Sequence, residues 1–102
     1  MAEARLSIPN ERIEAFCRKW KITELSLFGS VLRDDFGDAS DIDVLVAFAD
    51  DAEWDYFDWP EMTRELSSIF ADRAIDLVER ASVRNPFMRH AILTHRQVLY
   101  AA

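Results

Sequence analysis

The stretch LFGSVLRDDFGDASDIDVLV, residues 27–46, decides the fold, and its first part is a turn. The alternating run over residues 25–28 that leads into it is typical of a strand. Gly29 follows this run and, because it lacks a side chain, lets a ligand approach the backbone closely. Ser30 can cap a short helical segment over residues 31–33. Since the first amides of a helix favour an anion, the turn predicts a phosphate site.

Two acidic residues, Asp41 and Asp43, stand in the second part of the stretch, in a run that predicts a buried strand over residues 41–48. Side chains alternate between the two faces of a strand, so both carboxylates should point to the same face. Two acids side by side repel each other. A divalent cation would relieve this repulsion, and hard oxygen ligands suit Mg²⁺.

The turn and the acidic strand together indicate an active site for phosphoryl or nucleotidyl transfer. Each half alone has a plainer explanation, since a Gly-Ser pair occurs by chance and an Asp-x-Asp pair often marks a strand end or an acidic turn. Their order on one strand, turn and strand frame favours the functional interpretation. Residues 34–40 between them are polar, include Gly37, and are typical of a loop.

A third acid, Asp76, lies in a strand predicted over residues 74–79. If its apolar neighbours face the helices, Asp76 faces the other way, beside the first two acids. An acid inside an apolar strand is costly unless it is paired or bound to a metal. The alternative is an ion pair with Arg73 or Arg80.

A first helix is predicted ahead of these strands, capped by Ser7 or Asn10 and with Pro9 near its first turn. It carries an apolar stripe at helical spacing, made of Ile13, Phe16, Cys17 and Trp20. Cys17 is the only cysteine, which excludes an intrachain disulfide. We interpret it as a small core residue rather than a reactive thiol.

Residues 50–58 are both acidic and aromatic. They are either a solvated connection whose aromatic side chains fold back on the core, or a surface for a partner. Pro60 then opens a second helix. Its predicted buried stripe is Met62, Leu66, Ile69 and Phe70.

Asn85 and Pro86 start a last helix, and a short strand over residues 97–100 follows it. His90 and His95 lie in or just after this helix at a spacing that does not bring them onto one ligating face. We interpret both as surface or helix-end residues. Three arginines are assigned to solubility or a partner, without a catalytic role: Arg84, Arg89 and Arg96.

The bulk properties describe one small domain, expected to span residues 1–102. A net charge of −7 disfavours direct binding of nucleic acid and favours a basic protein partner. No apolar run has the length of a membrane span and no signal peptide precedes the first helix, so we expect the cytoplasm. The order of elements predicts an α/β (α+β) fold with one small mixed β-sheet, helices mainly on one face and the site on the open face.

The run GSVLRDDFGDASDIDVLV resembles the signature of the nucleotidyltransferase superfamily related to DNA polymerase β, a Gly-Ser pair followed by Asp-x-Asp. The short chain, Arg33 after the Gly-Ser pair and the run SDID at residues 40–43 make it similar to the minimal nucleotidyltransferase (MNT) domains. The similarity covers about residues 13–100. Leu32 and Asp34 depart from the family, which usually carries a small residue and Gly there, and neither is an expected ligand.

The resemblance implies the nucleotidyltransferase fold and transfer of a nucleoside monophosphate, AMP from ATP, to a hydroxyl group. Gly29 and Ser30 would hold the triphosphate, and Arg33 would steady the phosphates or reach one of the acids. The acids that bind two Mg²⁺ ions and catalyse the reaction would be Asp41, Asp43 and Asp76. Such ions lie about 3.5–4 Å apart and clamp the entering and leaving oxygens.

The resemblance also implies a partner, because MNT domains are commonly encoded beside HEPN-domain proteins in prokaryotic toxin–antitoxin pairs. Larger family members bind the acceptor with an extra domain that this chain lacks, so we expect the acceptor on a HEPN-type ribonuclease toxin, at a tyrosine. Two alternatives stay open: an antitoxin that occludes its toxin without catalysis, and transfer to a small molecule such as an antibiotic. The nucleotide, the acceptor residue, and a homo-oligomeric or hetero-oligomeric state are not determined by the sequence.

Overall fold

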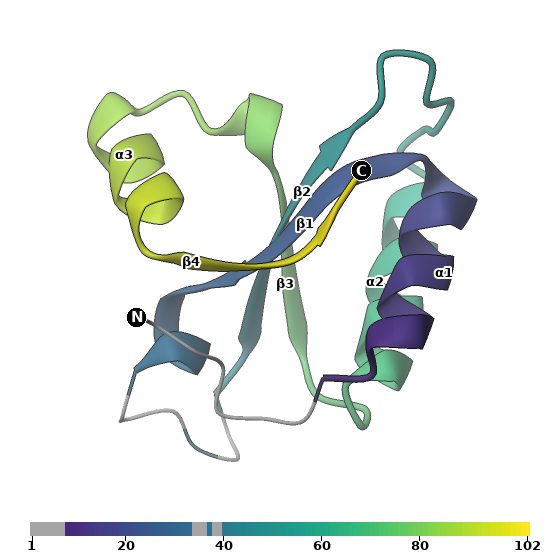
Figure 1. The fold of residues 1–102 in the computed structure, drawn as a ribbon, viewed down its shortest axis with the longest axis horizontal. Coiled ribbons are helices and arrows are strands. Elements are labelled where there is room, and N and C mark those ends of the chain that lie inside the picture. Colours follow the sequence, from purple (N-terminus) through teal and green to yellow (C-terminus); the bar gives the residue numbers. More distant parts are fainter. Residues whose placement is uncertain (1–7, 34–36, 38–39) are drawn as a thin grey trace.

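The computed structural model describes residues 8–33, 37 and 40–102. In this part of the chain three helices, two 3₁₀ turns and four strands alternate (Figure 1). In chain order they are α1 (Asn10–Trp20), β1 (Ile22–Phe28), η1 (Gly29–Leu32), β2 (Ile42–Phe48), α2 (Asp58–Ile69), β3 (Ile75–Glu79), η2 (Arg80–Ser82), α3 (Pro86–Thr94) and β4 (Arg96–Ala101). The predicted mixed class of helices and strands is confirmed, while most of the predicted loop over residues 34–40 and the cap at Ser7 lie outside the described residues.

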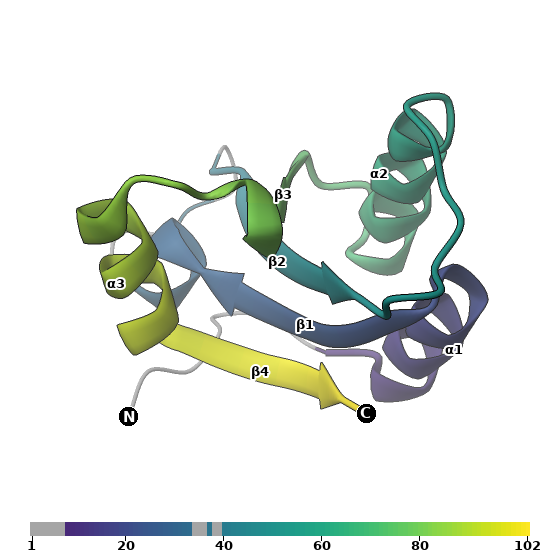
Figure 2. The same ribbon diagram turned by 90° about the horizontal axis from the view of Figure 1, so that it is seen from above.

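The four strands form one mixed sheet in the order β3-β2-β1-β4. β1 runs antiparallel to both β2 and β4, whereas β2 and β3 run parallel and are joined by α2. β3 and β4 are therefore the edge strands, and Figure 2 shows them on opposite borders of the sheet. α1 and α2 cover one face and α3 lies against the other, so the prediction of helices mainly on one face is confirmed.

The hydrophobic core lies between the sheet and the layer of α1 and α2. α1 buries Ile13, Phe16 and Cys17, which belong to the stripe that its helical spacing predicts. α2 buries Met62 and Leu66. Burial raises the pKa of the Cys17 thiol to about 12, which confirms that this side chain is a core residue.

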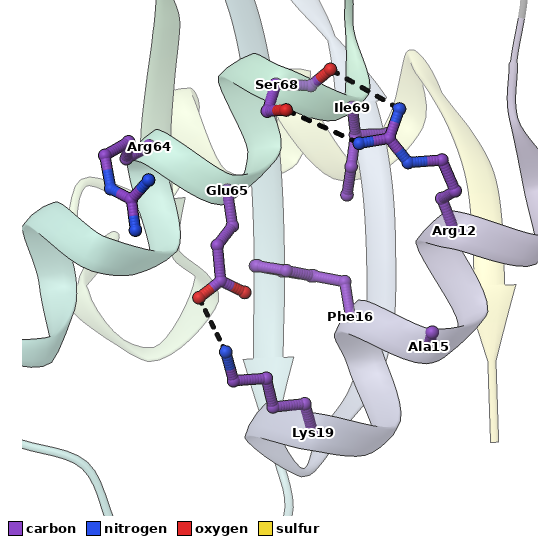
Figure 3. Close-up of a pocket in the computed structure, with 8 residues that line it drawn as sticks. All are labelled: Arg12, Ala15, Phe16, Lys19, Arg64, Glu65, Ser68 and Ile69. Atoms are coloured by element: carbon purple, nitrogen blue, oxygen red, sulfur yellow. Dashed lines mark hydrogen bonds and ion pairs between the residues drawn. The ribbon is translucent and has the colours of Figure 1, made fainter.

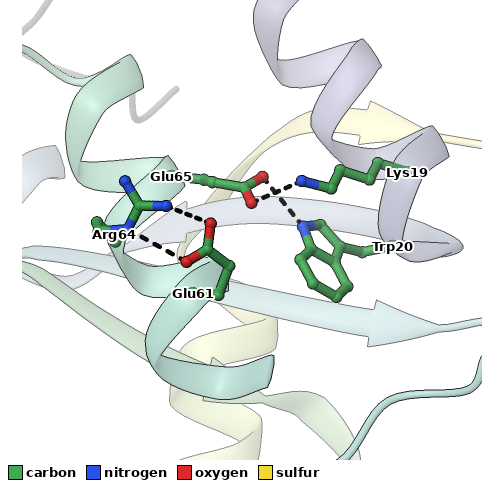
Figure 4. A network of polar contacts seen from close by, with 5 residues as sticks. All are labelled: Lys19, Trp20, Glu61, Arg64 and Glu65. Atoms are coloured by element: carbon green, nitrogen blue, oxygen red, sulfur yellow. Dashed lines mark hydrogen bonds and ion pairs between the residues drawn. The ribbon is translucent and has the colours of Figure 1, made fainter. Parts of the chain in front are cut away.

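Polar contacts on the outer side connect α1 to α2 near the end of α1 (Figure 4). The Glu65 carboxylate accepts from Lys19 Nζ at 2.7 Å and from the Trp20 indole N–H at 3.2 Å. Glu61 and Arg64 form an ion pair within α2. Because these charges are exposed or half-buried, we expect them to orient the two helices and to add little to the free energy of unfolding.

The alternation of side chains along β2 positions the candidate site. Ile42, Val44 and Val46 belong to the core cluster under the helices. Asp43 and Leu45 alternate with them and therefore point to the other face. Leu45 is covered there by the segment around α3, while Asp43 is only half-buried.

Pro60 lies in the first turn of α2, as predicted, and the helix itself begins two residues earlier, at Asp58. The Asp55 carboxylate accepts from the backbone N–H groups of Phe57 at 2.8 Å and of Asp58 at 3.3 Å. The Asp58 carboxylate in turn accepts from the Asp55 N–H at 3.0 Å. These side chains satisfy free amides at the helix start, so the helix begins ahead of the proline.

The acidic and aromatic stretch after β2 contains both of the features that the sequence leaves open. Trp54 folds back, with its ring centroid 4.9 Å from that of Phe48 and 5.2 Å from that of Trp59. Tyr56 and Phe57 instead are each 89% exposed. The stretch therefore contributes to the core and also presents two aromatic side chains at the surface.

The last helix starts as predicted. The Asn85 side chain accepts from the backbone N–H groups of Phe87 at 2.9 Å and of Met88 at 3.1 Å. His90 and His95 are exposed, which confirms their interpretation as surface residues. Within the described ranges, none of the helices combines the length and the apolar character that crossing a membrane requires.

Candidate functional site

Two of the predicted acids lie side by side on the open face of the sheet. Asp43 of β2 is in register with Asp76 of β3 across the parallel ladder, and with Phe28 at the end of β1 on its other side. The two carboxyl groups are close enough for Asp76 to raise the pKa of Asp43. The fold thus brings together two site residues that are far apart in the sequence.

The turn after β1 lies directly against the Asp43 carboxylate. Gly29 has a φ of +74°, in the left-handed region that favours glycine. A Cβ atom on Gly29 would overlap Asp43 Oδ2 and lie 3.2 Å from Asp43 Cγ. Glycine is therefore required here for the backbone conformation and also for the space that the carboxylate occupies.

The pKa of the Asp43 carboxyl is raised above its ordinary value, mainly by burial and then by the negative charge of Asp76. The hydrogen bond to Asp76 and the charge of Asp41 act in the same direction. The backbone N–H of Ser30 donates to Asp43 and lowers this pKa. The site therefore gathers negative charge around one half-buried carboxylate.

Asp41 lies just outside the strand that it was predicted to open. β2 begins at Ile42, and Asp41 is exposed, with its carbonyl oxygen accepting from the Ser30 hydroxyl at 3.4 Å. The turn η1 begins at Gly29 after Phe28, without a side-chain cap. The predicted capping role of Ser30 is therefore wrong, because its hydroxyl is used to link the turn to the start of β2.

The three predicted phosphate contacts form one continuous segment beside the acid pair. Arg33 ends this segment with an exposed side chain, and its backbone N–H donates to the Ser30 carbonyl at 2.9 Å. Gly29 and Ser30 precede it in the turn. Since the Ser30 amide contacts Asp43 and the Ser30 hydroxyl contacts Asp41, a phosphate would have to compete with the acidic strand for both groups.

Carboxylate oxygens at this site fit Mg²⁺, although no complete metal centre is formed. Within residues 8–33, 37 and 40–102, no three His, Cys, Asp or Glu side chains are placed to share one ion. Asp43 and Asp76 nevertheless offer hard oxygen ligands on neighbouring strands, and burial together with the negative charge of Asp76 raises the pKa of Asp43. Asp41, exposed beside the start of β2, would complete the set by turning its side chain inward.

Asp76 is exposed on an edge strand, so the burial argument that predicted its function was wrong. An acid at this position faces water and carries little desolvation cost. The alternative prediction paired it with Arg73 or Arg80. Arg73 donates to the Ser40 carbonyl at 2.9 Å, and Arg80 pairs with Glu24 at 3.6 Å. Both arginines are therefore engaged with other groups.

A second charged cluster lies further along the open face, and it is structural. Glu24 forms ion pairs with Arg96 and Arg80. Arg96 also donates to the buried Ser26 hydroxyl at 3.3 Å, and Arg89 donates to the Arg80 carbonyl at 3.1 Å. The assignment of Arg89 and Arg96 to solubility or a partner was wrong, because both hold the fold together. The sequence feature that could have revealed this cluster is the polar pair Glu24 and Ser26, which stand at strand spacing within an apolar run.

A cavity of about 340 Å³ lies between α1 and α2 (Figure 3), on the face opposite to the acids. Arg12 contacts the Ser68 carbonyl and hydroxyl at 3.5 Å, and Lys19 pairs with Glu65 at 2.7 Å. The charged side chains that line the cavity are therefore largely paired with neighbouring groups of the protein. We therefore assign no function to this cavity.

Similarity to known proteins points to the same chemistry as the acid pair. Residues 10–99 match the family described as nucleotidyltransferase domain. A relative from Methanocaldococcus jannaschii, named "putative protein adenylyltransferase", is 32% identical over 74 residues, which cover 72% of this chain and 72% of the relative.

Two solved structures share the fold. One, described as "Crystal structure of the toxin-antitoxin with AMP-PNP", has a TM-score of 0.72 and 26% identity, and the match covers 93% of this chain and 75% of that chain. The other, a crystal structure of the toxin-antitoxin MntA-HepT, has a TM-score of 0.63 and 25% identity. This match covers 91% of this chain and 70% of that chain. These likenesses confirm the resemblance found in the sequence, and the chain belongs to the nucleotidyltransferase-domain family as one of its minimal members.

Proposed function

We propose that this protein transfers AMP from ATP to a hydroxyl group of a partner toxin, and that it acts as the antitoxin in the cytoplasm. The observation that carries this proposal is the contact between Asp43 and Asp76 beside the Gly29 turn. Such a pair, next to a turn that resembles the phosphate-binding signature, is suited to nucleotidyl transfer. A relative named as a protein adenylyltransferase and a similar toxin-antitoxin structure with AMP-PNP support it.

In the proposed reaction the acceptor oxygen forms a bond to the α-phosphorus of ATP. The bond from that phosphorus to the oxygen leading to the β-phosphate breaks, and pyrophosphate leaves. The proton of the hydroxyl passes to the Asp76 carboxylate, which is exposed on an edge strand and so accessible to an acceptor from solution. Gly29 and Ser30 bind the phosphates in place of their present contacts with the acidic strand, and Arg33 steadies the phosphates.

Asp43 and Asp76, joined by Asp41, would hold the two expected Mg²⁺ ions. When bound, Mg²⁺ neutralises the acids and polarises the α-phosphate. The raised pKa of Asp43 supports this role, because the charges around it are those of other carboxylates. Cation binding would remove an electrostatic cost that the fold otherwise retains.

The proposed acceptor is a tyrosine hydroxyl of a HEPN-type toxin. The similar structure of MntA-HepT supports a toxin as partner. The net charge of −7 also suits a basic, RNA-binding protein, because opposite charges speed encounter and favour the correct partner.

The test measures the intact mass of a candidate toxin, the protein encoded in the neighbouring reading frame, after co-expression with this protein. The wild type should add one AMP unit to the toxin and restore growth. Asp76→Asn keeps the shape of the side chain but removes the proton acceptor, so it should bind the toxin without modifying it. Asp72→Asn, at an exposed acid just before β3, is the matched control and should behave like the wild type.

A second candidate is an antitoxin that occludes its toxin without catalysis. The observation that favours it is that no three metal-ligating side chains converge in the described part of the chain. If the protein acts by occlusion, the wild type and Asp76→Asn should both restore growth, and neither should add mass to the toxin. Full rescue by Asp76→Asn with an unmodified toxin would overturn the catalytic proposal.

A further inference from the structure

β3 is an edge strand that pairs, within the described residues, with β2 alone. The Ile42 N–H donates to the Ala74 carbonyl at 2.9 Å, so the main-chain groups of Ala74 face β2. These groups alternate in direction along a strand, which turns those of Leu77 and Glu79 outward. The Ser82 hydroxyl donates to the Glu79 carbonyl at 2.8 Å. The main-chain groups of Leu77 and the Glu79 N–H therefore point away from β2, on the side where another strand could pair with them.

A groove of about 520 Å³ borders this edge. One wall comes from β3, and the other is an aromatic wall from the loop before α2 and from the start of α2: Leu77, Val78, Glu79, Trp54, Tyr56 and Trp59. Trp54 packs against Trp59 at 5.2 Å, which makes part of the wall rigid. Tyr56 is 89% exposed and is available to contact a bound side chain.

An acidic side chain lines this apolar groove, and further acids stand in the loop that forms its aromatic wall. Glu79 lies in the β3 wall, and the loop that carries Trp54 and Tyr56 contains Asp50, Asp51, Glu53 and Asp55. Of these, Asp51 pairs with Lys21 at 3.0 Å on the surface. An apolar centre with an acidic rim complements a segment that carries an apolar anchor and basic flanking residues.

The groove and the acid pair reach the β3 edge from opposite faces of the sheet, because Asp76 and Leu77 are neighbours in β3. Leu77 belongs to the core side of the sheet, so Asp76 points to the open face. In a strand added to β3, the residue opposite Asp76 would share its face at a Cβ separation of about 4.5–5.5 Å. The next residue of that strand would face the side of the groove.

We propose that the β3 edge is the docking site for an extended segment of the toxin, which adds to the sheet as a fifth strand. This segment places a large apolar side chain in the groove beside Trp54 and Tyr56. Its neighbouring residue presents the acceptor hydroxyl to Asp76, and lysine or arginine residues flank both. The inference rests on the proposed function for the identity of the partner, and it gives this small chain a way to hold the acceptor.

Tyr56→Ser tests the groove, with Phe57→Ser as the matched control. Both side chains are 89% exposed in the same loop, so neither change should affect folding, and of the two it is Tyr56 that lines the groove. The measurement is calorimetry with the purified candidate toxin, the protein encoded in the neighbouring reading frame. We expect Tyr56→Ser to weaken binding about tenfold, and Phe57→Ser to change it less than about twofold. Equal effects of the two changes would overturn the groove as the anchor site.

Glu79→Pro tests the main-chain contact, with Glu79→Gln as its control. Residue 79 has a φ of −84°, close to that of proline, and its N–H points away from β2. Proline should therefore remove an outward donor while the ladder between β2 and β3 stays intact. We expect Glu79→Pro to bind the toxin about fivefold more weakly than Glu79→Gln. Equal affinities of these two variants would exclude strand addition.

Docking and transfer are separated by measuring affinity and added mass in the same set of variants. If the wild type binds the toxin without modifying it, and Tyr56→Ser weakens that binding, the docking site stands and the transfer reaction fails. If Tyr56→Ser and Glu79→Pro bind and modify the toxin like the wild type, the docking site is wrong and the transfer reaction stands. Phe87→Ser probes a rival surface on α3, since Phe87 is 86% exposed, and a loss of affinity confined to it would also overturn the β3 edge.

Discussion

Two carboxylates on the same face of the sheet differ in the charge of their neighbours, which is positive for one and negative for the other. Glu24 in β1 is held by Arg96 and Arg80. Asp43 in β2 faces the Asp76 carboxylate instead, and its pKa is raised by burial and by that neighbour. Both side chains are half-buried, so the contrast comes from the partners that the fold supplies.

This contrast separates a charge that holds the fold from a charge that is available for function. A partly buried carboxylate contributes to stability when cations pair with it, as Arg96 and Arg80 do with Glu24. A carboxylate placed against another acid lowers stability until a cation or a proton arrives, as at Asp43. Charges left unbalanced in this way gather at functional sites, which is why we place the site at Asp43 and Asp76.

The largest effect is expected for Asp43→Asn. Transfer of AMP should fall more than about 100-fold, since loss of even a supporting residue at a metal site costs about 10–100-fold. In the absence of Mg²⁺ the free energy of unfolding at pH 7 should stay level or rise, because the repulsion with Asp76 is removed. Mass spectrometry of the toxin and urea unfolding with a chelator measure the two quantities. Near-wild-type transfer would refute the metal-binding role of Asp43.

Glu24→Gln should show the opposite behaviour. It leaves Arg96 and Arg80 half-buried without their carboxylate, so we expect the free energy of unfolding to fall by about 2 kcal/mol. Urea unfolding measures this change, and the transfer rate per folded molecule should be retained. If stability were unchanged, Glu24 would not be a structural charge and the comparison with Asp43 would fail.

An effect on stability of similar size is expected for Gly29→Ala, which introduces a Cβ atom against Asp43 at a positive φ. The change should lower the free energy of unfolding by about 2–3 kcal/mol, of which the left-handed backbone accounts for about 1–2 kcal/mol. In an Asp43→Ala background only the backbone share should remain. A double-mutant cycle of urea midpoints measures the difference, and equal costs in both backgrounds would exclude the contact with Asp43 as a cause.

The smallest effect is the pH dependence of stability without metal. Because the folded state raises the pKa of Asp43, it favours the protonated carboxyl. The stabilising contribution is complete below the ordinary aspartate pKa and is lost as the pH rises through the raised value. The stability of Asp43→Asn relative to the wild type should therefore rise with pH over this acidic range and then level off. Thermal melts of both proteins with a chelator measure this difference in stability across the pH range. A difference that falls with rising pH would contradict the assigned cause.

Features that repeat within one segment were predictable from the sequence. The burial of Ile13 and Phe16 follows from helical spacing, and the placement of Asp43 on the open face follows from strand alternation. Features that depend on contacts between segments were missed or misplaced. The ion pair of Glu24 with Arg96 joins β1 to β4, and no local pattern connects those residues. The early start of α2 depends on the Asp55 side chain, which accepts from the backbone N–H groups of Phe57 and Asp58.

By itself, the sequence determined the turn at Gly29 and Ser30, the face on which Asp43 lies and the family, because turn chemistry, strand period and motif spacing are properties of neighbouring residues. Only the tertiary structure decided that Gly29 lies against the Asp43 carboxylate, and that Asp76 stands exposed on an edge strand. The physical reason is that strand order and register bring distant segments together. Burial, contact and the sign of the neighbouring charge are set by that arrangement, and a period along one strand does not encode which strand will lie at the border of the sheet.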